Sequence, residues 1–345
     1  MTERHGWARR GSLTGMRDRP EGLDEPGLRR ALDPWGIDAV SLAYAPVGFG
    51  DYHWTAVDGR ERQWFVTVAD LAHKSHCGDG PEAAFGGLRR AMDTAWALQH
   101  QGELDFVVAP LRTADGETVR RLGARHALSV FPFVDGTPGR FGQTLTSQER
   151  GLVVDMLAEL HRRTPPASAP VLQPDLSARG RLEEALEELD RPWQGGPFAE
   201  PARVLVSDRA AGFRRRLDEL DQRVGELSSR RQAPVVTHGE PHPGNLLWLA
   251  DRCLLVDWDT VGLAVPERDL WMVATEPDDL AGYADAGGRR PDPSALALYR
   301  LRWDLEDVAV FVDLFRSPHD RTADAEKAWA GLTSIMERLT GDGRV

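Results

Sequence analysis

The pattern of apolar and polar positions divides the chain near residue 135. Before that point, alternating runs predict short strands, and a stretch with a period of about 3.6 residues predicts a helix. The expected elements are a helix over 24–33, strands over 40–46, 52–58 and 63–71 with a turn at Asp58-Gly59, a helix over 82–100, and two strands between 106 and 134 around a turn at Asp115-Gly116. Residues 23–135 are therefore expected to form an N-terminal lobe built on an antiparallel sheet with one helix.

After "DGTPG" at 135–139 the pattern becomes helical. Thr146 and Glu149 form a capping-box pair that begins a helix over 148–164, which Pro165 and Pro166 end. Further helices are expected over 178–189, 199–229, 294–316 and 322–339. Residues 136–345 therefore form a larger, mainly helical lobe, and the chain is of the α+β class. Residues 1–22 lack such a pattern and are expected to be disordered, with Met1 or Met16 as the start.

Charge and composition narrow the possible partners. The 345 residues carry a net charge of −12, which argues against nucleic acid and anionic membranes and would attract a cationic small molecule. No run approaches the roughly 18 apolar residues that a membrane helix needs. Two cysteines in unlike contexts and an N-terminus without a secretory signal pattern favour a cytoplasmic protein. Composition leaves the oligomeric state open.

Candidate chemistry concentrates in "THGEPHPGNLLW" (237–248) and "LLVDWDTVG" (254–262). The runs "NLLWL" and "CLLVDW" predict a hairpin that brings Asn245 and Asp257 to one end, and their oxygens suit Mg²⁺. Glu240 lies nearby and could orient an attacking hydroxyl. Its spacing of five residues from Asn245, and a Gly48-Phe49-Gly50 loop between the first two strands, are typical of phosphoryl transfer in kinase-like folds.

These segments resemble the H-G-D-x-H-x-x-N and D-W-[DE] signatures of the aminoglycoside phosphotransferase and choline kinase-like family. The resemblance covers about residues 40 to 316 in element order and is most specific over 237–270. "PVGFGDYHW" and "WFVTV" are similar to an actinobacterial subgroup near the spectinomycin phosphotransferases. The resemblance implies a two-lobed protein-kinase-like fold that transfers phosphate from ATP or GTP, with Mg²⁺, to a hydroxyl of a small molecule. A cationic antibiotic is the expected acceptor, and antibiotic resistance the expected role.

The resemblance also implies a role for each matching position. Glu240 takes the position of the catalytic acid, Asn245 and Asp257 take the magnesium positions, and Asp259 touches a second magnesium or braces the site. His238 and His242 are structural residues of the catalytic loop, and Asp269 caps or ties a helix. The positions expected to contact nucleotide are Gly48, Phe49, Gly50, Thr67, Lys74, Phe131 and Phe133, and those expected to contact the acceptor are Trp303, Asp304 and Asp307.

Two departures from the family pattern leave alternatives open. The family has Asp where this chain has Glu240, whose carboxylate lies about 1.5 Å further from the backbone. The third strand carries Thr67 where the phosphate-binding lysine is expected, so Lys74 or Arg89 replaces it, or Thr67 acts without charge; Glu82 is the expected partner of such a lysine. The rival hypotheses are a nucleotide-binding pseudokinase and a kinase of another metabolite, such as choline, a sugar, a macrolide or homoserine.

Overall fold

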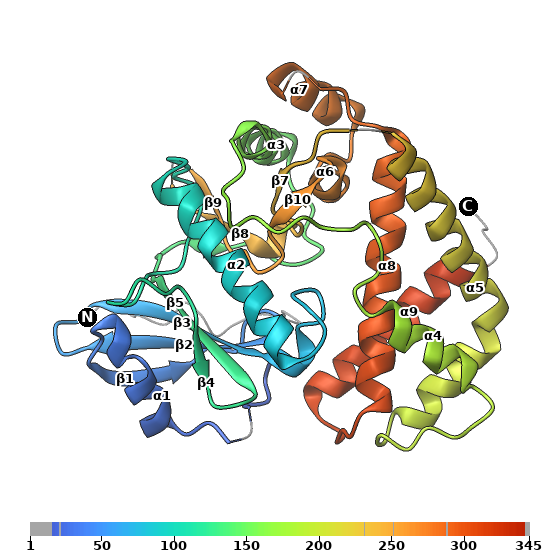
Figure 1. Cartoon of the computed structure of the whole chain (residues 1–345), viewed down its shortest axis with the longest axis horizontal. Helices are drawn as coiled ribbons and strands as arrows, with labels where there is room; N and C mark the ends of the chain where they lie inside the picture. The colour runs from blue at the N-terminus through green and yellow to red at the C-terminus, as the bar shows by residue number, and fades with distance from the viewer. Residues whose placement is uncertain (1–15, 21, 231, 251, 288, 342–345) are drawn as a thin grey trace.

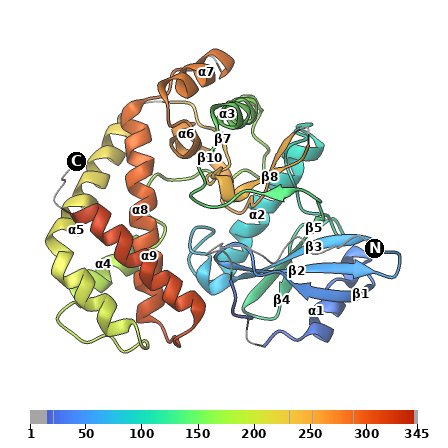
Figure 2. The same ribbon diagram turned by 180° about the vertical axis from the view of Figure 1, so that it is seen from behind.

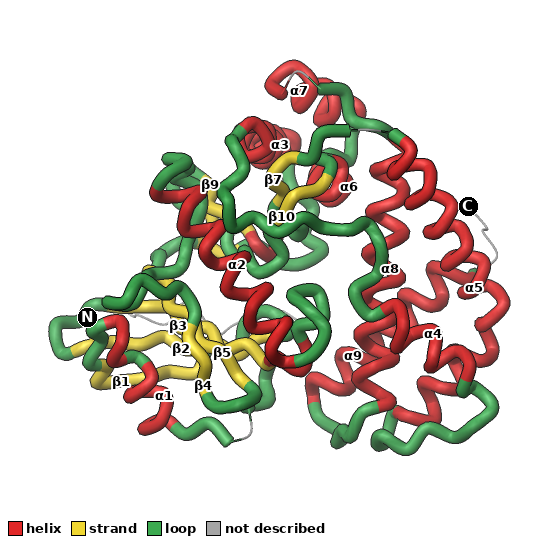
Figure 3. Tube along the Cα trace, in the orientation of Figure 1, coloured by secondary structure: helices red, strands yellow, loops and turns green. Residues whose placement is uncertain are grey.

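The chain folds into two lobes, as the sequence predicted. We describe a computed structural model of residues 16–20, 22–230, 232–250, 252–287 and 289–341. A sheet lobe lies on one side and a helical lobe on the other, and the chain passes between them after β5 (Figures 1 and 2). Helices predominate outside the first lobe, as the trace coloured by secondary structure shows (Figure 3). The part of the chain described here contains no helix long and apolar enough to cross a membrane.

Five antiparallel strands in the order β1-β2-β3-β5-β4 form the sheet of the N-terminal lobe. Alternate side chains of β2 and β3, such as Trp54 and Val66, are buried beside helix α1. The alternation of apolar and polar residues in the sequence therefore gives the sheet one apolar face. Helix α2 runs from this lobe toward the second one (Figure 1). The elements are α1 (Glu25–Ala31), β1 (Ala39–Tyr44), β2 (Asp51–Asp58), β3 (Gln63–Asp70), α2 (Pro81–His100), β4 (Arg120–Leu122) and β5 (His126–Pro132).

The predicted turn of the second hairpin was wrong. β4 and β5 pair through Leu122 and His126, so the chain reverses at Gly123, which has a φ of +68°. Asp115-Gly116 instead closes a separate turn, in which the Gly116 N–H donates to the carbonyl of Thr113. The apolar run before it leaves the sheet, and Val107 forms a bridge with Leu255 of the second lobe. A buried apolar run has the same composition whether it forms a strand of the sheet or packs against the second lobe, and tertiary contacts decided between these two positions.

The second lobe is mainly helical, with short strands at the catalytic segment. The capping box of Thr146 and Glu149 begins α3, as predicted. The hairpin β8–β9 also forms where the sequence placed it, whereas the pairing of β7 with β10 was not anticipated. The elements are β6 (Thr137–Pro138), α3 (Ser147–Arg162), α4 (Arg179–Glu187), α5 (Ala199–Ser229), β7 (Val235–Thr237), β8 (Leu246–Trp248), β9 (Cys253–Leu255), β10 (Gly262–Ala264), α6 (Glu267–Val273), α7 (Pro277–Gly287), α8 (Pro293–Arg316) and α9 (Ala323–Thr340).

One apolar core crosses the boundary between the lobes. It joins Leu88 and Met92 of α2 to Leu255 and Trp258 beside the catalytic segment. A separate core holds α4, α5, α8 and α9 together. The shared core fixes the sheet lobe against the loops that carry the candidate site.

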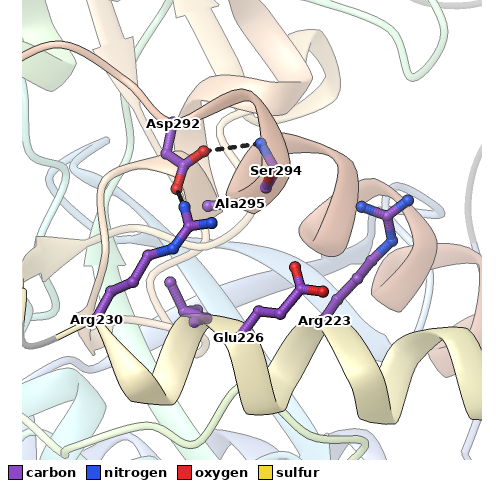
Figure 4. A pocket seen from close by; sticks show the side chains of 7 residues that line it. Arg223, Glu226, Arg230, Asp292, Ser294 and Ala295 are labelled. Carbon is purple, nitrogen blue, oxygen red and sulfur yellow. Dashed lines mark hydrogen bonds and ion pairs between the residues drawn. The ribbon is translucent and has the colours of Figure 1, made fainter.

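A polar junction ties the end of α5 to the start of α8 (Figure 4). Asp292 accepts the Ser294 N–H at 2.9 Å as the cap of α8, and it also pairs with Arg230 after α5. Its own N–H donates to Glu267 at 2.7 Å. The hollow beside this junction measures only about 10 Å³, so it is a structural joint rather than a ligand site.

The segment Met16–Asp18 is placed in the structure, which differs from the expected disorder over 1–22. The Met16 N–H donates to the Gly48 carbonyl at 3.0 Å, and the Arg17 and Asp18 N–H groups donate to Asp324 of α9 at 2.8 and 3.0 Å. The remainder of that expectation, at residues 1–15 and 21, lies outside the described residues. The placed segment therefore joins the glycine-containing loop to the helical lobe.

Candidate active site

The catalytic loop leaves β7 at Thr237 and is held by His238, which is fully buried. Nε2 of His238 lies 2.9 Å from the carbonyl of Val256, and Nδ1 accepts the Glu240 N–H at 3.1 Å. Burial lowers the pKa of His238 to about 4, so the ring is neutral and can accept through one nitrogen and donate through the other. The side chain thereby connects the loop before Glu240 to the strand end before Asp257.

Asp269, at the start of α6, holds the same loop from the other side. Its carboxylate accepts the N–H groups of His238 at 2.8 Å and Gly239 at 2.6 Å, and it lies 3.0 Å from Nε2 of His161. Burial raises the pKa of Asp269, but the hydrogen bond from His161 and the nearby charges of His161 and Arg268 together outweigh burial, and the net shift is downward. Asp269 is an anionic anchor for the loop backbone.

The hairpin β8–β9 brings Asn245 and Asp257 to one end. Nδ2 of Asn245 donates to the Glu240 carbonyl at 3.0 Å, and the carbonyl of Asn245 accepts the Val256 N–H at 3.0 Å. Asp257 follows at once, with a φ of +66° that is uncommon for a residue other than glycine. Such backbone strain concentrates at functional sites, because the surrounding structure must hold it.

Lys74 lies buried at the meeting point of the two lobes. Its Nζ lies 2.9 Å from Asp51, just after the glycine-containing loop, and 2.5 Å from Asp259, just after Asp257. Burial lowers the pKa of Lys74, but the carboxylates of Asp259 and Asp51 outweigh it and hold the pKa well above its ordinary value. Lys74 is therefore a permanent cation of the cleft.

The other candidates for the missing strand lysine lie elsewhere. Oγ1 of Thr67 lies 3.1 Å from Nδ1 of His53, Arg89 is exposed on α2, and Glu82 forms an ion pair with Arg121 at 2.7 Å. The expected pairing of a lysine with Glu82 was thus wrong for Lys74. Glu82 sits at the exposed start of α2, whereas Lys74 turns inward toward two aspartates.

Sequence reasoning missed two further residues of this loop, His76 and Cys77. Nε2 of His76 lies 3.2 Å from the Asp259 carboxylate, and Sγ of Cys77 lies 3.7 Å from the Asp259 carbonyl. The sequence feature that could have pointed to them is their place in the same loop as Lys74, shortly after the third strand. Since Lys74 and His76 both pair with the carboxylate of Asp259, Asp259 acts here as a counter-ion that joins the lobes.

The donor set fits a divalent cation. Within the described residues, no hydrogen bond or ion pair occupies the carboxylate of Asp257 or the amide oxygen of Asn245. Loss of hydration in the cleft and the negative charge of Asp259 raise the pKa of Asp257 well above its ordinary range. No group of three or more His, Cys, Asp or Glu side chains in the described part could hold a metal alone. Carboxylate and amide oxygens such as those of Asp257 and Asn245 are ligands that magnesium takes, and phosphate and water commonly complete its shell.

The expected nucleotide-contacting loop lies between β1 and β2. Gly48 and Gly50 adopt φ angles of +69° and +105°, which glycine tolerates. Phe49 at the tip contacts Phe311 of α8, with ring centroids 6.2 Å apart, and Lys327 of α9 lies 5.1 Å from its ring. The other two expected contacts follow the sheet: Phe131 lies in β5, opposite Phe65, and Phe133 lies just after that strand.

A cavity of about 400 Å³ opens beside Glu240 and is lined by both lobes. The expected acceptor residues Trp303 and Asp307 line it, together with Trp271, Tyr299 and Arg268. Asp304 does not line the cavity. It lies on the side of α8 that faces α9, one helical turn before Val308, and its carboxylate pairs with Arg338 of α9 at 2.5 Å. The structure therefore separates two acidic residues that helical spacing left together.

Glu240 and Asp307 place two carboxyl groups in this cavity, which Arg268 and Arg302 also line. Burial and the charge of Asp259 raise the pKa of Glu240, and burial and the charge of Glu240 raise the pKa of Asp307 to about 8. Nε2 of His242 is 4.0 Å from the Glu240 carboxylate, and its ring meets Phe141 and Trp303 edge-on. A hydroxyl beside Glu240 could donate to its carboxylate, while an ammonium group could pair with Asp307.

Known proteins share both the sequence pattern and the fold. The model of the phosphotransferase enzyme family (APH) matches residues 48–309. Protein StrN of Streptomyces griseus is 32% identical over 270 residues, which are 74% of this chain and 79% of StrN. Spectinomycin phosphotransferase APH(9)-Ia, solved with ADP and spectinomycin, aligns over 93% of this chain and 99% of its own with a TM-score of 0.68 and 17% identity. A microcompartment-associated aminopropanol kinase aligns over 92% and 96%, with a TM-score of 0.57 and 18% identity.

Proposed function

Because the chain belongs to the phosphotransferase enzyme family and is thus a small-molecule phosphotransferase acting on hydroxyl groups, we propose that it transfers the γ-phosphate of ATP to an amine-bearing acceptor with Mg²⁺. GTP is the alternative donor. The acceptor we propose is an aminoglycoside- or aminocyclitol-like antibiotic, and the physiological role is antibiotic resistance.

The observation that carries this proposal is the pair of carboxylates on one cavity. Glu240 and Asp307 both line it, and neither has an ion-pair partner within 3.5 Å among the described residues. Glu240 also lies one hydrogen bond from Asn245, through its carbonyl at 3.0 Å. An acceptor in this cavity would thus meet one carboxylate beside the phosphate-binding loops and a second that favours a positive charge.

Each residue has a distinct part in the proposed reaction. Glu240 orients the acceptor hydroxyl and takes its proton as the phosphoryl group transfers. Asn245 and Asp257 would hold magnesium, which when bound neutralises charge on the phosphates. Lys74 supplies the cation that strand β3 lacks, and the loop of Gly48, Phe49 and Gly50 covers the phosphates. The connector that begins near Phe131 and Phe133 would contact the adenine through its backbone groups.

Relatives support an acceptor with an amine, although they do not identify it. The structural neighbours include an enzyme solved with spectinomycin and an aminopropanol kinase. The net charge of −12 favours a cationic acceptor in the same way. Fold alone does not fix the substrate, so the acceptor must be identified by experiment.

The test is transfer of radiolabelled γ-phosphate from ATP with Mg²⁺ to a panel of aminocyclitols, aminoglycosides, macrolides, choline and aminopropanol. Wild type is compared with Glu240→Gln and Asp257→Ala. Transfer to an amine-bearing compound that both variants lose supports the proposal. Transfer only to neutral acceptors would contradict the proposal that the acceptor carries an amine. ATP binding without transfer to any acceptor would favour a pseudokinase.

A further inference from the structure

We propose that Arg268 is a positioning residue that fixes the backbone of Gly239 and so aims the carboxylate of Glu240. This inference rests on the proposed function, because it concerns the same reaction. Arg268 is the second residue of α6, and it lies between the catalytic loop and the loop that follows Asp257.

The guanidinium of Arg268 bridges these two loops. Nη1 donates to Oγ1 of Thr237 at 2.8 Å, and Nη2 donates to the carbonyl of Thr260 at 2.9 Å. Thr260 in turn donates its hydroxyl to the carbonyl of His238 at 2.9 Å. The bridge therefore links Thr237 and His238, which precede Gly239, to Thr260, which follows Asp259.

The same guanidinium lies against Gly239. A Cβ atom at position 239 would come within 2.3 Å of Nη2, 2.5 Å of Nη1 and 2.6 Å of Cζ of Arg268, so the plane of the guanidinium covers that side of the residue. On its other side, the Gly239 N–H donates to Asp269 at 2.6 Å. Two consecutive residues of α6 thus hold Gly239, whose φ of +104° already requires glycine.

Arg268 has no carboxylate within ion-pair distance in the described part of the chain, whereas Arg302, which also lines the cavity, lies 3.5 Å from Glu306. Burial lowers the pKa of Arg268. A desolvated cation without a direct counter-ion is unfavourable for stability, so the two hydrogen bonds of this side chain and its contact with Gly239 point to a geometric task. A planar fork can reach two acceptors at once, whereas a lysine cannot.

The consequence concerns the residue that follows. With Gly239 held on two sides, the Cα–Cβ direction of Glu240 is fixed relative to Asn245. Misplacement of a reacting group by about 1 Å can lower the rate on the order of 100-fold. Arg268 would therefore affect turnover through the loop that it holds, although its side chain also lines the cavity.

Hydrogen exchange of the apo protein tests the positioning directly, using Arg268→Met and Arg268→Lys. Exchange over 236–241 and 257–261 should accelerate at least about tenfold in both variants, since neither can bridge Thr237 and Thr260. The control is Arg150→Met, which breaks the 2.8 Å ion pair with Asp279 away from this cavity and should leave those segments unchanged. Unchanged exchange in Arg268→Lys, which keeps charge and length, would overturn the proposal.

Kinetics test the consequence. With an acceptor found by the transfer assay, kcat of Arg268→Met should fall about 100-fold, the Kd for Mg·ATP should change less than about twofold, and added guanidinium ion should restore part of kcat. A parallel loss of kcat and nucleotide affinity, equal to that of Arg150→Met, would show general unfolding and overturn the inference. If wild type phosphorylates no acceptor, the proposed function fails, while the exchange result still decides the role of Arg268.

Discussion

At the scale of single residues, the cleft holds more negative charge than its cations balance. Asp51, Glu240, Asp257 and Asp259 approach one another around two cations, Lys74 and His76. The raised pKa of Asp257 and the raised pKa of Glu240 both reflect this crowding together with lost hydration. A divalent cation beside Asp257 would relieve the repulsion between these carboxylates.

Glu240 offers the sharpest test of a single side chain. Glu240→Gln should lower kcat about 100- to 1,000-fold, because an amide cannot take the hydroxyl proton, while binding of Mg·ATP is kept. Glu240→Asp should also lose on the order of 100-fold, since the loop is held and the shorter side chain falls short. Steady-state kinetics and calorimetric titration with Mg·ATP measure the two effects. If Glu240→Asp were faster than wild type, Glu240 would be a less effective catalytic acid than the aspartate of the family pattern.

Asp307 should impose a pH dependence on stability. Its pKa is about 8 in the folded protein and near 4 when unfolded, so the unfolded state loses its proton first and stability falls as the pH rises from about 4 to about 8. Asp307→Asn removes this loss and should be more stable than wild type by roughly 2 kcal/mol at pH 8, with little difference at pH 4. Urea unfolding at both values measures it, and Asp304→Asn, which loses the Arg338 ion pair, is the control. An equal effect of Asp307→Asn at both pH values would contradict the assignment.

At the scale of elements, the loop between β3 and α2 brings a lysine into the cleft, where β3 itself carries Thr67. It carries Lys74, His76 and Cys77, all directed at Asp259. The alternation of β3 predicted the strand correctly, and it identified Thr67 as the residue at the expected lysine position. Whether a loop residue reaches the cleft depends on loop conformation, which periodicity does not encode.

Removal of Lys74 should destabilise the fold. Lys74→Met leaves the buried Asp51 without its cation and leaves Asp259 with His76 alone, and we expect a loss of roughly 3 kcal/mol at pH 7. Lys74 holds the pKa of Asp259 well below its ordinary value, so this stabilisation is present above the unfolded pKa near 4 and fades below it. The difference from wild type should therefore shrink in acid. Chemical unfolding at pH 7 and about pH 3 measures it, and Lys327→Met is a control for the loss of a lysine elsewhere.

At the scale of the whole molecule, the lobes are joined on two sides of the cavity. Phe49 and Met16–Asp18 reach α8 and α9 on one side, and the loop of Lys74 reaches Asp259 on the other. Phe311 lies one helical turn after Asp307 on α8. The loop of Gly48, Phe49 and Gly50 is thus in direct contact with α8, so under the proposed function binding of nucleotide should affect binding of the acceptor.

Phe49→Ala tests that contact. The edge-to-face pair with Phe311 is worth about 1 kcal/mol, so its loss should weaken binding of a non-hydrolysable ATP analogue about fivefold, since the loop is less well held. Calorimetric titration measures the Kd. Phe141→Ala is the matched control: Phe141 is 63% exposed and contacts His242 and Trp303 rather than the loop. Equal weakening in both variants would contradict a specific role for Phe49.

The sequence by itself determined the class of fold, the main helices and strands, and the hairpin that unites Asn245 with Asp257. These follow from local rules, namely the periods of 2 and 3.6, the capping box at Thr146 and the short apolar runs of β8 and β9. Only the tertiary structure decided which acidic residue of α8 lines the cavity, where Lys74 and His76 lie, and how Arg268 meets Gly239. Those contacts join residues up to 185 positions apart, and the free energies that choose among them come from burial and charge neutralisation, which exist only once the lobes have packed.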